Sequence, residues 1–256
     1  MTLTYGSYLR LDELLSLQRP ESDEHDEILF IVIHQIYELW FKEMIHELDR
    51  LGSLLELDLV PQALNTLKRV LTVLKIAVAQ TDVLETMSPL DFLSFRDRLE
   101  TASGSQSVQF RELEFAIGIK DARVVADFAD EERGRLEARL AAPTVWDALL
   151  GHLARRGHPI PADALERDVR LRIEPSEGVE RALLAVYRED PESAALCERF
   201  LDLDEGVQEW RYRHVKMVER TIGTRRGTGG SSGVAFLKRT LFDPAFPDLW
   251  AVRSAF

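Results

Sequence analysis

The sequence predicts an all-α protein, a bundle of long helices joined by short connections. Long stretches place apolar residues three or four positions apart, which is the spacing of one face of an α-helix. No window alternates apolar and polar residues between hairpin turns, as half-buried strands would. There is no internal repeat and no shift of composition, so we expect residues 1–256 to form a single helical domain.

Composition limits the possible classes of protein. With 256 residues, 45% of them hydrophobic and 30% charged, the chain resembles an ordinary soluble globular protein with a sizeable core. A formal net charge of −12 argues against nucleic acid or an anionic membrane surface as the main partner. No stretch is apolar enough to span a bilayer, and the polar N-terminus predicts no signal peptide. Because the single cysteine, Cys197, excludes a disulfide framework and a thiolate zinc cluster, we expect a reduced, cytoplasmic protein.

The first part of the chain combines an aromatic segment with a long helix. Residues 3–9 carry two tyrosines, and we expect so aromatic a segment to dock either onto its own core or onto a neighbouring subunit. From residue 23 to about residue 55 one helical face is apolar and aromatic. Its members are Phe30, Ile33, Tyr37, Trp40, Met44, Leu48 and Leu51. His34 lies beside this face, one turn after Phe30, so the two side chains point the same way. Gln35, Glu38 and Lys42 are assigned to other faces of the helix.

Two further helices and a variable region follow. Residues 64–79 predict a third helix. Ser88 and Pro89 are typical of an N-cap followed by proline at the first helical position. The helix that they open carries Phe92 and Arg96, again one turn apart, although a solvated surface arginine would fit the same pattern. Residues 122–190 are charge-rich and helical in pattern, and we interpret them as a peripheral helical excursion.

The last long helix, beginning at Pro191, contains a histidine on its apolar face. That face is formed by Leu196, Phe200, Leu203, Val207, Trp210 and Met217. His214 lies on it, four residues after Trp210. A buried imidazole must be paired, because an unpaired polar group in the interior costs several kcal/mol. It is therefore either a core histidine satisfied by a carbonyl or carboxylate, or a neutral metal ligand.

A glycine-rich run, residues 227–233, follows this helix. It lacks the ending and the preceding strand of a phosphate-binding loop. Its glycines would still let the backbone approach a ligand, and the hydroxyls of Thr228, Ser231 and Ser232 could hold an anion or an ammonium group. A flexible surface loop is the alternative.

The positions of the two helical histidines favour one kind of catalytic site over three alternatives. The sequence lacks the nucleophile turn of a Ser–His–Asp hydrolase, the paired histidines of a zinc hydrolase and the two Glu-x-x-His motifs of a di-iron bundle. One histidine on each of two long helices fits haem better, with one imidazole on the iron and the other over the open face. The spacing alone leaves this open.

Several segments, distributed over most of the length of the chain, together resemble the tryptophan 2,3-dioxygenase family. They are residues 3–9, 30–42, 91–96 with 103–104, 106–112, 210–223 and 227–233.

The resemblance implies haem b as cofactor and a role for each histidine. His214 resembles the proximal haem ligand, and His34 resembles the distal histidine that hydrogen-bonds the indole N–H. Ser103 and Gly104 resemble the backbone turn beside the haem.

The resemblance also implies an amino-acid site. Phe30 and Phe92 resemble the residues that pack against the indole ring. Arg96 resembles the residue that binds the substrate carboxylate, and Thr228 resembles the residue that contacts the ammonium and carboxylate groups. In the family, the positions of Tyr5, Tyr8 and Leu9 close the pocket of a neighbouring subunit, so a homotetramer is expected.

The expected reaction is the haem-dependent insertion of dioxygen across the indole C2–C3 bond of L-tryptophan, which gives N-formylkynurenine. One position departs from the family: Ser105 stands where a phenylalanine is common. A monooxygenase that turns a substituted tryptophan, such as β-methyltryptophan, into a 2-oxindole is therefore an alternative. A non-catalytic haem-binding or sensing protein is a third, although Arg96 and Thr228 speak against it.

Overall fold

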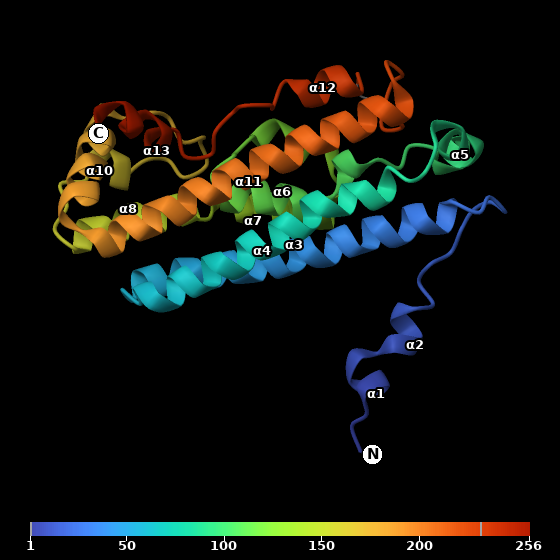
Figure 1. The fold of residues 1–256 in the computed structure, drawn as a ribbon, viewed down its shortest axis with the longest axis horizontal. Helices are drawn as coiled ribbons and strands as arrows, with labels where there is room; N and C mark the ends of the chain where they lie inside the picture. The colour runs from blue at the N-terminus through green and yellow to red at the C-terminus, as the bar shows by residue number, and fades with distance from the viewer. Residues whose placement is uncertain (1, 231) are drawn as a thin grey trace.

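Three long helices form the body of the protein, whose computed structural model describes residues 2–230 and 232–256. They are α3 (Glu27–Glu56), α4 (Val60–Leu84) and α11 (Pro191–Ile222). Helix α4 packs against both α3 and α11, so the three lie side by side (Figure 1). No β-strand occurs in the part of the chain that the structure describes, which confirms the all-α prediction.

Shorter helices cover and connect this body. In chain order they are α1 (Tyr5–Leu9), α2 (Leu11–Leu14), α5 (Pro89–Phe95), η1 (Arg96–Leu99), η2 (Gly104–Gln106), α6 (Val108–Ala116), η3 (Ala122–Asp127), α7 (Asp130–Ala141), α8 (Val145–Arg155), α9 (Ala162–Leu165), α10 (Glu177–Glu189), α12 (Val234–Lys238), α13 (Pro247–Ala251) and η4 (Val252–Ala255). None of the helices within residues 2–230 and 232–256 is both long enough and apolar enough to cross a bilayer.

The apolar faces predicted for the long helices form the core. On α11, Leu196, Phe200 and Leu203 are almost completely buried, and they meet the buried face of α4. The predicted N-cap is also present: the Ser88 hydroxyl accepts from the Asp91 N–H while the Asp91 carboxylate accepts from the Ser88 N–H. This capping box starts α5 at Pro89 and so fixes the helix that carries Phe92.

Residues 122–190 are helical, as expected, and two of their helices enter the main core. Trp146 on α8 and Leu183 on α10 are fully buried there. Helix α7 instead joins α6 and η3 in a smaller apolar cluster around Phe115 and Leu136.

A buried carboxylate fastens the C-terminal segment to α11. Asp204 is 1% exposed and accepts four hydrogen bonds. The donors are the N–H groups of Ala245 (3.0 Å) and Phe246 (2.9 Å), the indole N–H of Trp250 (3.0 Å) and the side-chain amide of Gln208 (2.9 Å). These bonds set the position of the chain that follows α12.

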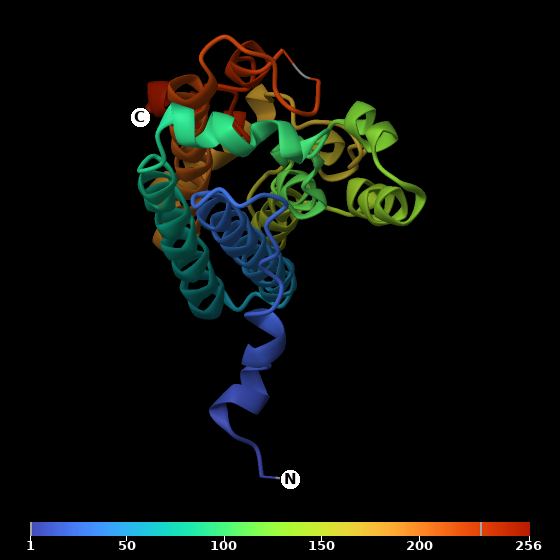
Figure 2. The ribbon, with the colours of Figure 1, turned by 90° about the vertical axis from the view of Figure 1, so that its right-hand side faces the viewer.

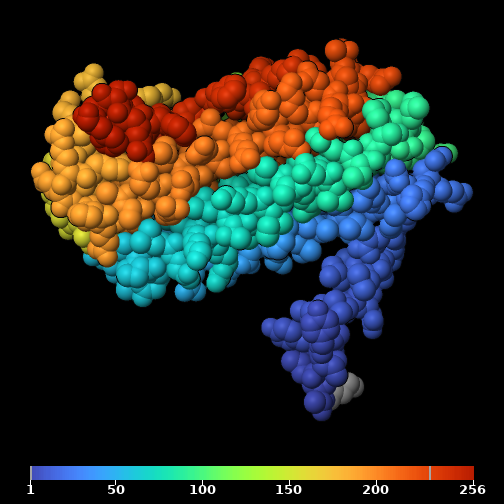
Figure 3. All heavy atoms as spheres, in the orientation of Figure 1, coloured from blue at the N-terminus to red at the C-terminus, as the bar shows by residue number. Residues whose placement is uncertain are grey.

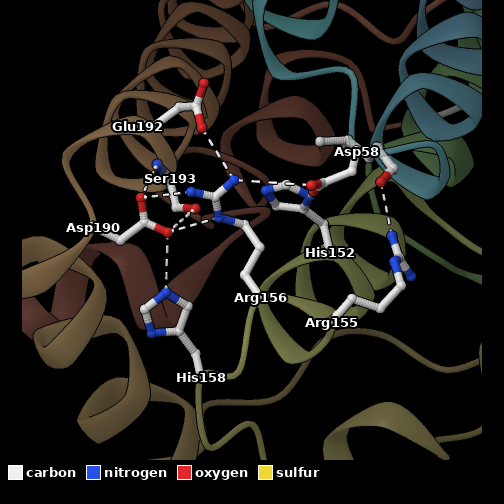
Figure 4. Close-up of polar contacts among 9 residues, drawn as sticks. Asp58, His152, Arg155, Arg156, His158, Asp190, Glu192 and Ser193 are labelled. Carbon is white, nitrogen blue, oxygen red and sulfur yellow. Dashed lines mark hydrogen bonds and ion pairs between the residues drawn. The ribbon is translucent and has the colours of Figure 1, made fainter.

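A polar junction, made by Asp58, His152, Arg156, His158 and Asp190, joins the start of α11 to α8 and to the α3–α4 turn (Figure 4). Arg156 Nε donates to Asp190 at 2.8 Å, and His152 Nδ1 lies 2.8 Å from Asp58. Asp190 is also the N-cap of α11. Burial would raise its pKa, but the bonds from Arg156, Ser193 and His158 outweigh burial and hold the pKa well below its usual range.

The N-terminal arm, residues 2–19, projects away from the body (Figures 1, 2 and 3). Helices α1 and α2 contain no buried residue. Tyr5 and Tyr8 are 77% and 70% exposed, and Leu15 is 72% exposed. So much uncovered apolar surface on one segment is typical of an interaction site.

Candidate functional site

The candidate site is a cavity of about 830 Å³ between α3, α5, α6 and α11. This size is within the range of small-molecule and cofactor pockets. Most of the predicted site residues line it, and they come from segments far apart in the sequence. They are Phe30, His34, Phe92, Arg96, Ser103, Gly104, His214 and Thr228.

The imidazole of His214 has no hydrogen-bond or ion-pair partner among the residues that the structure describes. No group in residues 2–230 and 232–256 forms a hydrogen bond or ion pair with it, so a core histidine satisfied by a carbonyl or carboxylate is not what the fold contains. Its ring stacks on Trp210, with 5.1 Å between ring centroids and an interplanar angle of 4°. Burial, with a smaller contribution from the nearby His34, lowers the pKa of His214 to about 4. The ring is therefore neutral at physiological pH and has a free lone pair, as a metal ligand requires.

His34 lines the same cavity from α3. Its Nδ1 lies 2.7 Å from the carbonyl oxygen of Phe30, so we assign the ring proton to Nδ1 as the donor of that bond. Nε2 is then the unprotonated nitrogen, and it can accept a hydrogen bond. Burial lowers the pKa of His34, which keeps the ring neutral.

Three phenylalanines make an aromatic wall next to His34. The Phe30 ring lies 4.1 Å from the imidazole of His34, and 5.8 Å and 5.7 Å from the rings of Phe92 and Phe95. Phe92 and Phe95 meet edge to face at 5.5 Å. Flat rings at these separations offer an aromatic guest offset-stacked and edge-to-face contacts.

Arg96 and the glycine-rich loop meet at the edge of the cavity. Arg96 Nη2 donates to the carbonyl oxygen of Arg226 at 2.6 Å, whereas its buried Nε has no hydrogen-bond partner within residues 2–230 and 232–256. The Thr228 hydroxyl donates to the carbonyl oxygen of Ala102 at 2.5 Å. A guanidinium with an unused donor, held beside a backbone loop, is suited to bind a carboxylate.

The loop packs closely on the turn that contains Ser103 and Gly104. A Cβ atom added to Gly229 would lie 2.8 Å from Ser103 Cβ, so only glycine allows this approach. Gly233 has φ +63°, and a Cβ there would lie 2.5 Å from the carbonyl oxygen of Arg225. These two glycines explain the composition of the run. Ser231, also suggested as an anion contact, lies outside the described residues.

The arm residues do not line this cavity. Tyr5, Tyr8 and Leu9 are exposed on the projecting segment, so the structure gives them no place in the site of their own chain.

One cavity residue was assigned wrongly from the sequence. Glu38 was placed on another face of its helix, but it lines the cavity one turn after His34. The signal was available, because residues four apart on a helix share a face. A second group, the buried ion pair between Arg211 and Glu114 (2.7 Å), carried no sequence signal, since it joins α11 to α6 across 97 residues.

The fold and the cavity together define an all-helical protein with a candidate cofactor site. It has an unpaired neutral imidazole on one helix, a second imidazole on another helix, an aromatic wall and a guanidinium at its edge.

Comparisons with known proteins agree with this class. A sequence model of the family described as Tryptophan 2,3-dioxygenase matches residues 1–139 and 177–256. A tryptophan 2,3-dioxygenase from Anaeromyxobacter dehalogenans is 60% identical over 255 residues, which are 99% of this chain and 96% of the relative. Relatives with the same name from Herpetosiphon aurantiacus and Caulobacter vibrioides are 54% and 45% identical, each over 98% of both chains. The chain therefore belongs to the tryptophan 2,3-dioxygenase family, a family of enzymes.

Proposed function

We propose that this protein binds haem b through His214 and inserts both atoms of dioxygen across the indole C2–C3 bond of L-tryptophan, giving N-formylkynurenine. The observation that carries the proposal is the imidazole of His214, which forms no hydrogen bond with residues 2–230 and 232–256 and lines a cavity together with His34 and Arg96. The family membership of the chain supports it.

The cavity residues fit a haem. The imidazole of His214 would hold the iron, and Trp210, stacked on it, fixes the plane of the ring. Ser103 and Gly104 would border the porphyrin, since a Cβ added to Gly104 would meet no atom within 4 Å. When bound, haem iron supplies the redox chemistry that activates dioxygen.

The remaining residues bind and orient tryptophan. Arg96 would hold the substrate carboxylate, and Thr228 would contact the carboxylate and ammonium groups. His34 Nε2 would accept a hydrogen bond from the indole N–H, as the proton on Nδ1 allows. Phe30 and Phe92 would contact the indole ring and exclude water. Fixing both ends of the substrate holds the indole C2–C3 bond in one position, which favours reaction.

The N-terminal arm supports a homotetramer in which Tyr5, Tyr8 and Leu9 cover the cavity of a neighbouring copy. These side chains are exposed in their own chain, and cover from a second copy would bury them. We also treat residues 1–256 as one functional domain, because a single large core cluster includes side chains from α3, α4, α8, α10 and α11.

A monooxygenase that forms a 2-oxindole from a substituted tryptophan is the second candidate, and Ser105 favours it. This exposed serine lines the cavity on the η2 turn, and its hydroxyl donates to Ser103 at 3.1 Å. So small a side chain leaves room for an additional group on the substrate.

Mass spectrometry under isotopically labelled dioxygen tests both reactions. We expect two labelled atoms in a ring-opened product of L-tryptophan. One labelled atom in a product of β-methyltryptophan with an intact ring would favour the second candidate, and no turnover of either compound by fully haem-loaded protein would refute both. His214→Ala should abolish the haem Soret band while the helical circular dichroism is kept, and an unchanged Soret band would refute the ligand assignment.

A further inference from the structure

Glu38 is a charged residue of the cavity to which the proposed function gives no role. It lies on α3 one helical turn after His34, on the wall of the same cavity. A half-buried carboxylate beside aromatic rings needs a hydrogen-bond partner, because its charge is poorly solvated there.

Gln109, in the first turn of α6, is that partner. Its side-chain amide donates to the Glu38 carboxylate at 2.9 Å and also to the Glu38 backbone carbonyl at 2.9 Å. The two bonds limit the rotamers of Glu38 and join α6 to the turn of α3 that follows His34. The carboxylate is therefore fixed rather than free to turn into solvent.

We propose that Glu38 and Gln109 are positioning residues for His34, and that they strengthen the hydrogen bond that His34 accepts from the indole N–H of the substrate. This inference rests on the proposed function and adds two residues to it. Gln109 holds the carboxylate, and the negative charge of the carboxylate makes the imidazole a better acceptor. Gln109 does not line the cavity, so it acts only through Glu38.

Electrostatics at His34 agree with this role. Burial lowers the pKa of His34, whereas the Phe30 carbonyl and the charge of Glu38 act in the opposite direction. The other charged or titratable groups that line the cavity are Tyr37 on α3, Arg96 after α5, Arg111 and Glu114 on α6, Lys120, Asp121, Arg123 and Asp127 in residues 120–127, Arg172 before α10, Arg211 and His214 on α11, and Arg239 and Asp243 after α12. Arg111 and Arg211 are both paired with Glu114, at 2.7 Å each. Of these groups, Glu38 is the anion on the helix that carries His34.

The experiment compares two ligands that differ in one donor. L-Tryptophan has the indole N–H, and its benzothiophene isostere has sulfur in that place. Binding of each to the ferric holoprotein is measured from the change in the haem absorption band. We expect Glu38→Gln to weaken tryptophan binding by roughly three- to tenfold, because a hydrogen bond loses its charge assistance. Binding of the isostere should be unchanged.

Further variants separate the role of Glu38 from general damage. Glu43→Gln removes a carboxylate from the same helix outside the cavity, and it should leave both affinities unchanged. Gln109→Met keeps the negative charge of Glu38 but removes the hydrogen bonds that hold its carboxylate. It should therefore weaken the binding of tryptophan but not that of the isostere. In the double variant Glu38→Gln with Gln109→Met, the two losses of tryptophan affinity should not add, since both residues act through one contact. If Glu38→Gln does not retain haem, Gln109→Met with the two ligands carries the same test.

The proposed function and this inference fail in different ways. A holoprotein that binds no tryptophan would refute the function and the inference with it. The role of Glu38 alone would be refuted if the holoprotein binds tryptophan and the Glu38→Gln and Gln109→Met variants lose affinity equally for tryptophan and the isostere. It would also be refuted if these variants lose affinity for neither ligand.

Discussion

Arg96 has only part of its donor capacity in use. One nitrogen donates to the Arg226 carbonyl, and in the described part of the chain the buried Nε has no hydrogen-bond partner. A buried donor without an acceptor costs roughly 1–3 kcal/mol, which an incoming carboxylate would recover. The contact to Arg226 also orients the guanidinium before any ligand arrives.

We predict that Arg96→Ala raises KM for tryptophan by roughly thirtyfold, about 2 kcal/mol for a lost charged hydrogen bond, with a smaller effect on kcat. Steady-state kinetics at saturating dioxygen would measure it. Arg98→Ala is the matched control, because Arg98 is an exposed arginine on the same short helix that does not line the cavity. An unchanged KM in Arg96→Ala would mean that the carboxylate is held elsewhere.

Asp248 gives a second prediction at this scale. Burial, with a smaller contribution from Glu180, outweighs the bond from the Ser176 N–H and raises the pKa of Asp248 to about 6. Because the folded pKa is above the unfolded one, its stabilising contribution is complete below pH 3.8 and is lost as pH rises through about 6.

Asp248→Asn should therefore stabilise the fold at pH 8 by up to about 3 kcal/mol, and by much less at pH 4. The amide oxygen can still accept from Ser176, so the comparison isolates the charge. Urea unfolding at the two pH values would measure the difference. If the substitution changes the free energy of unfolding equally at the two pH values, the negative charge of Asp248 does not destabilise the folded protein.

The roles predicted for the site residues came from the family resemblance rather than from spacing, and Glu38 was not among them; eight of those residues line one cavity. A polar residue next to an apolar face is normally solvated, and the sequence does not reveal that α6 brings Gln109 against this turn. The unpartnered state of His214 also depends on the whole fold. The sequence could only require that its imidazole have a partner or a metal.

At the scale of elements, periodicity predicted the long helices well. The third helix, predicted at residues 64–79, spans Val60–Leu84. The extra turns include Pro61 near the start of the helix, where proline is tolerated, and polar residues near its end that the apolar pattern did not include. Contacts between elements that are distant in the sequence had no local signal. The hydrogen bond from the Phe246 N–H in the C-terminal segment to the Asp204 carboxylate is one example.

Asp204→Ala should destabilise the protein by about 3–5 kcal/mol, because it leaves buried N–H donors without an acceptor. Denaturant unfolding would give the total, and hydrogen exchange should show faster exchange at Ala245 and Phe246. Glu205→Ala, an exposed carboxylate at the next position, should have little effect. A loss below about 1 kcal/mol would mean that water replaces the carboxylate.

At the scale of the whole molecule, the projecting arm is the feature that one chain alone does not explain. Its two short helices bury nothing within the chain. The sequence indicated that this segment docks somewhere, and it could not tell an intramolecular site from a neighbouring copy.

Deleting residues 2–17 should disrupt the proposed homotetramer and raise KM for tryptophan, while the proposed haem binding through His214 is kept. Analytical ultracentrifugation and kinetics would measure the two effects. The double substitution of Tyr5 and Tyr8 by alanine should raise KM without shortening the chain. A truncated protein with the same mass distribution and the same KM would contradict an exchange of arms between subunits.

Helix α11 runs without a break from the polar junction at Asp190, past Asp204, to His214. Each residue of an α-helix advances the chain by about 100° and 1.5 Å. One residue inserted between Asp204 and Trp210 would therefore turn the imidazole about a quarter of a circle away from the cavity and shift it along the axis. The number of residues between these points, and not only their identity, is under constraint, so insertions and deletions would be tolerated in the connecting loops but not along this helix.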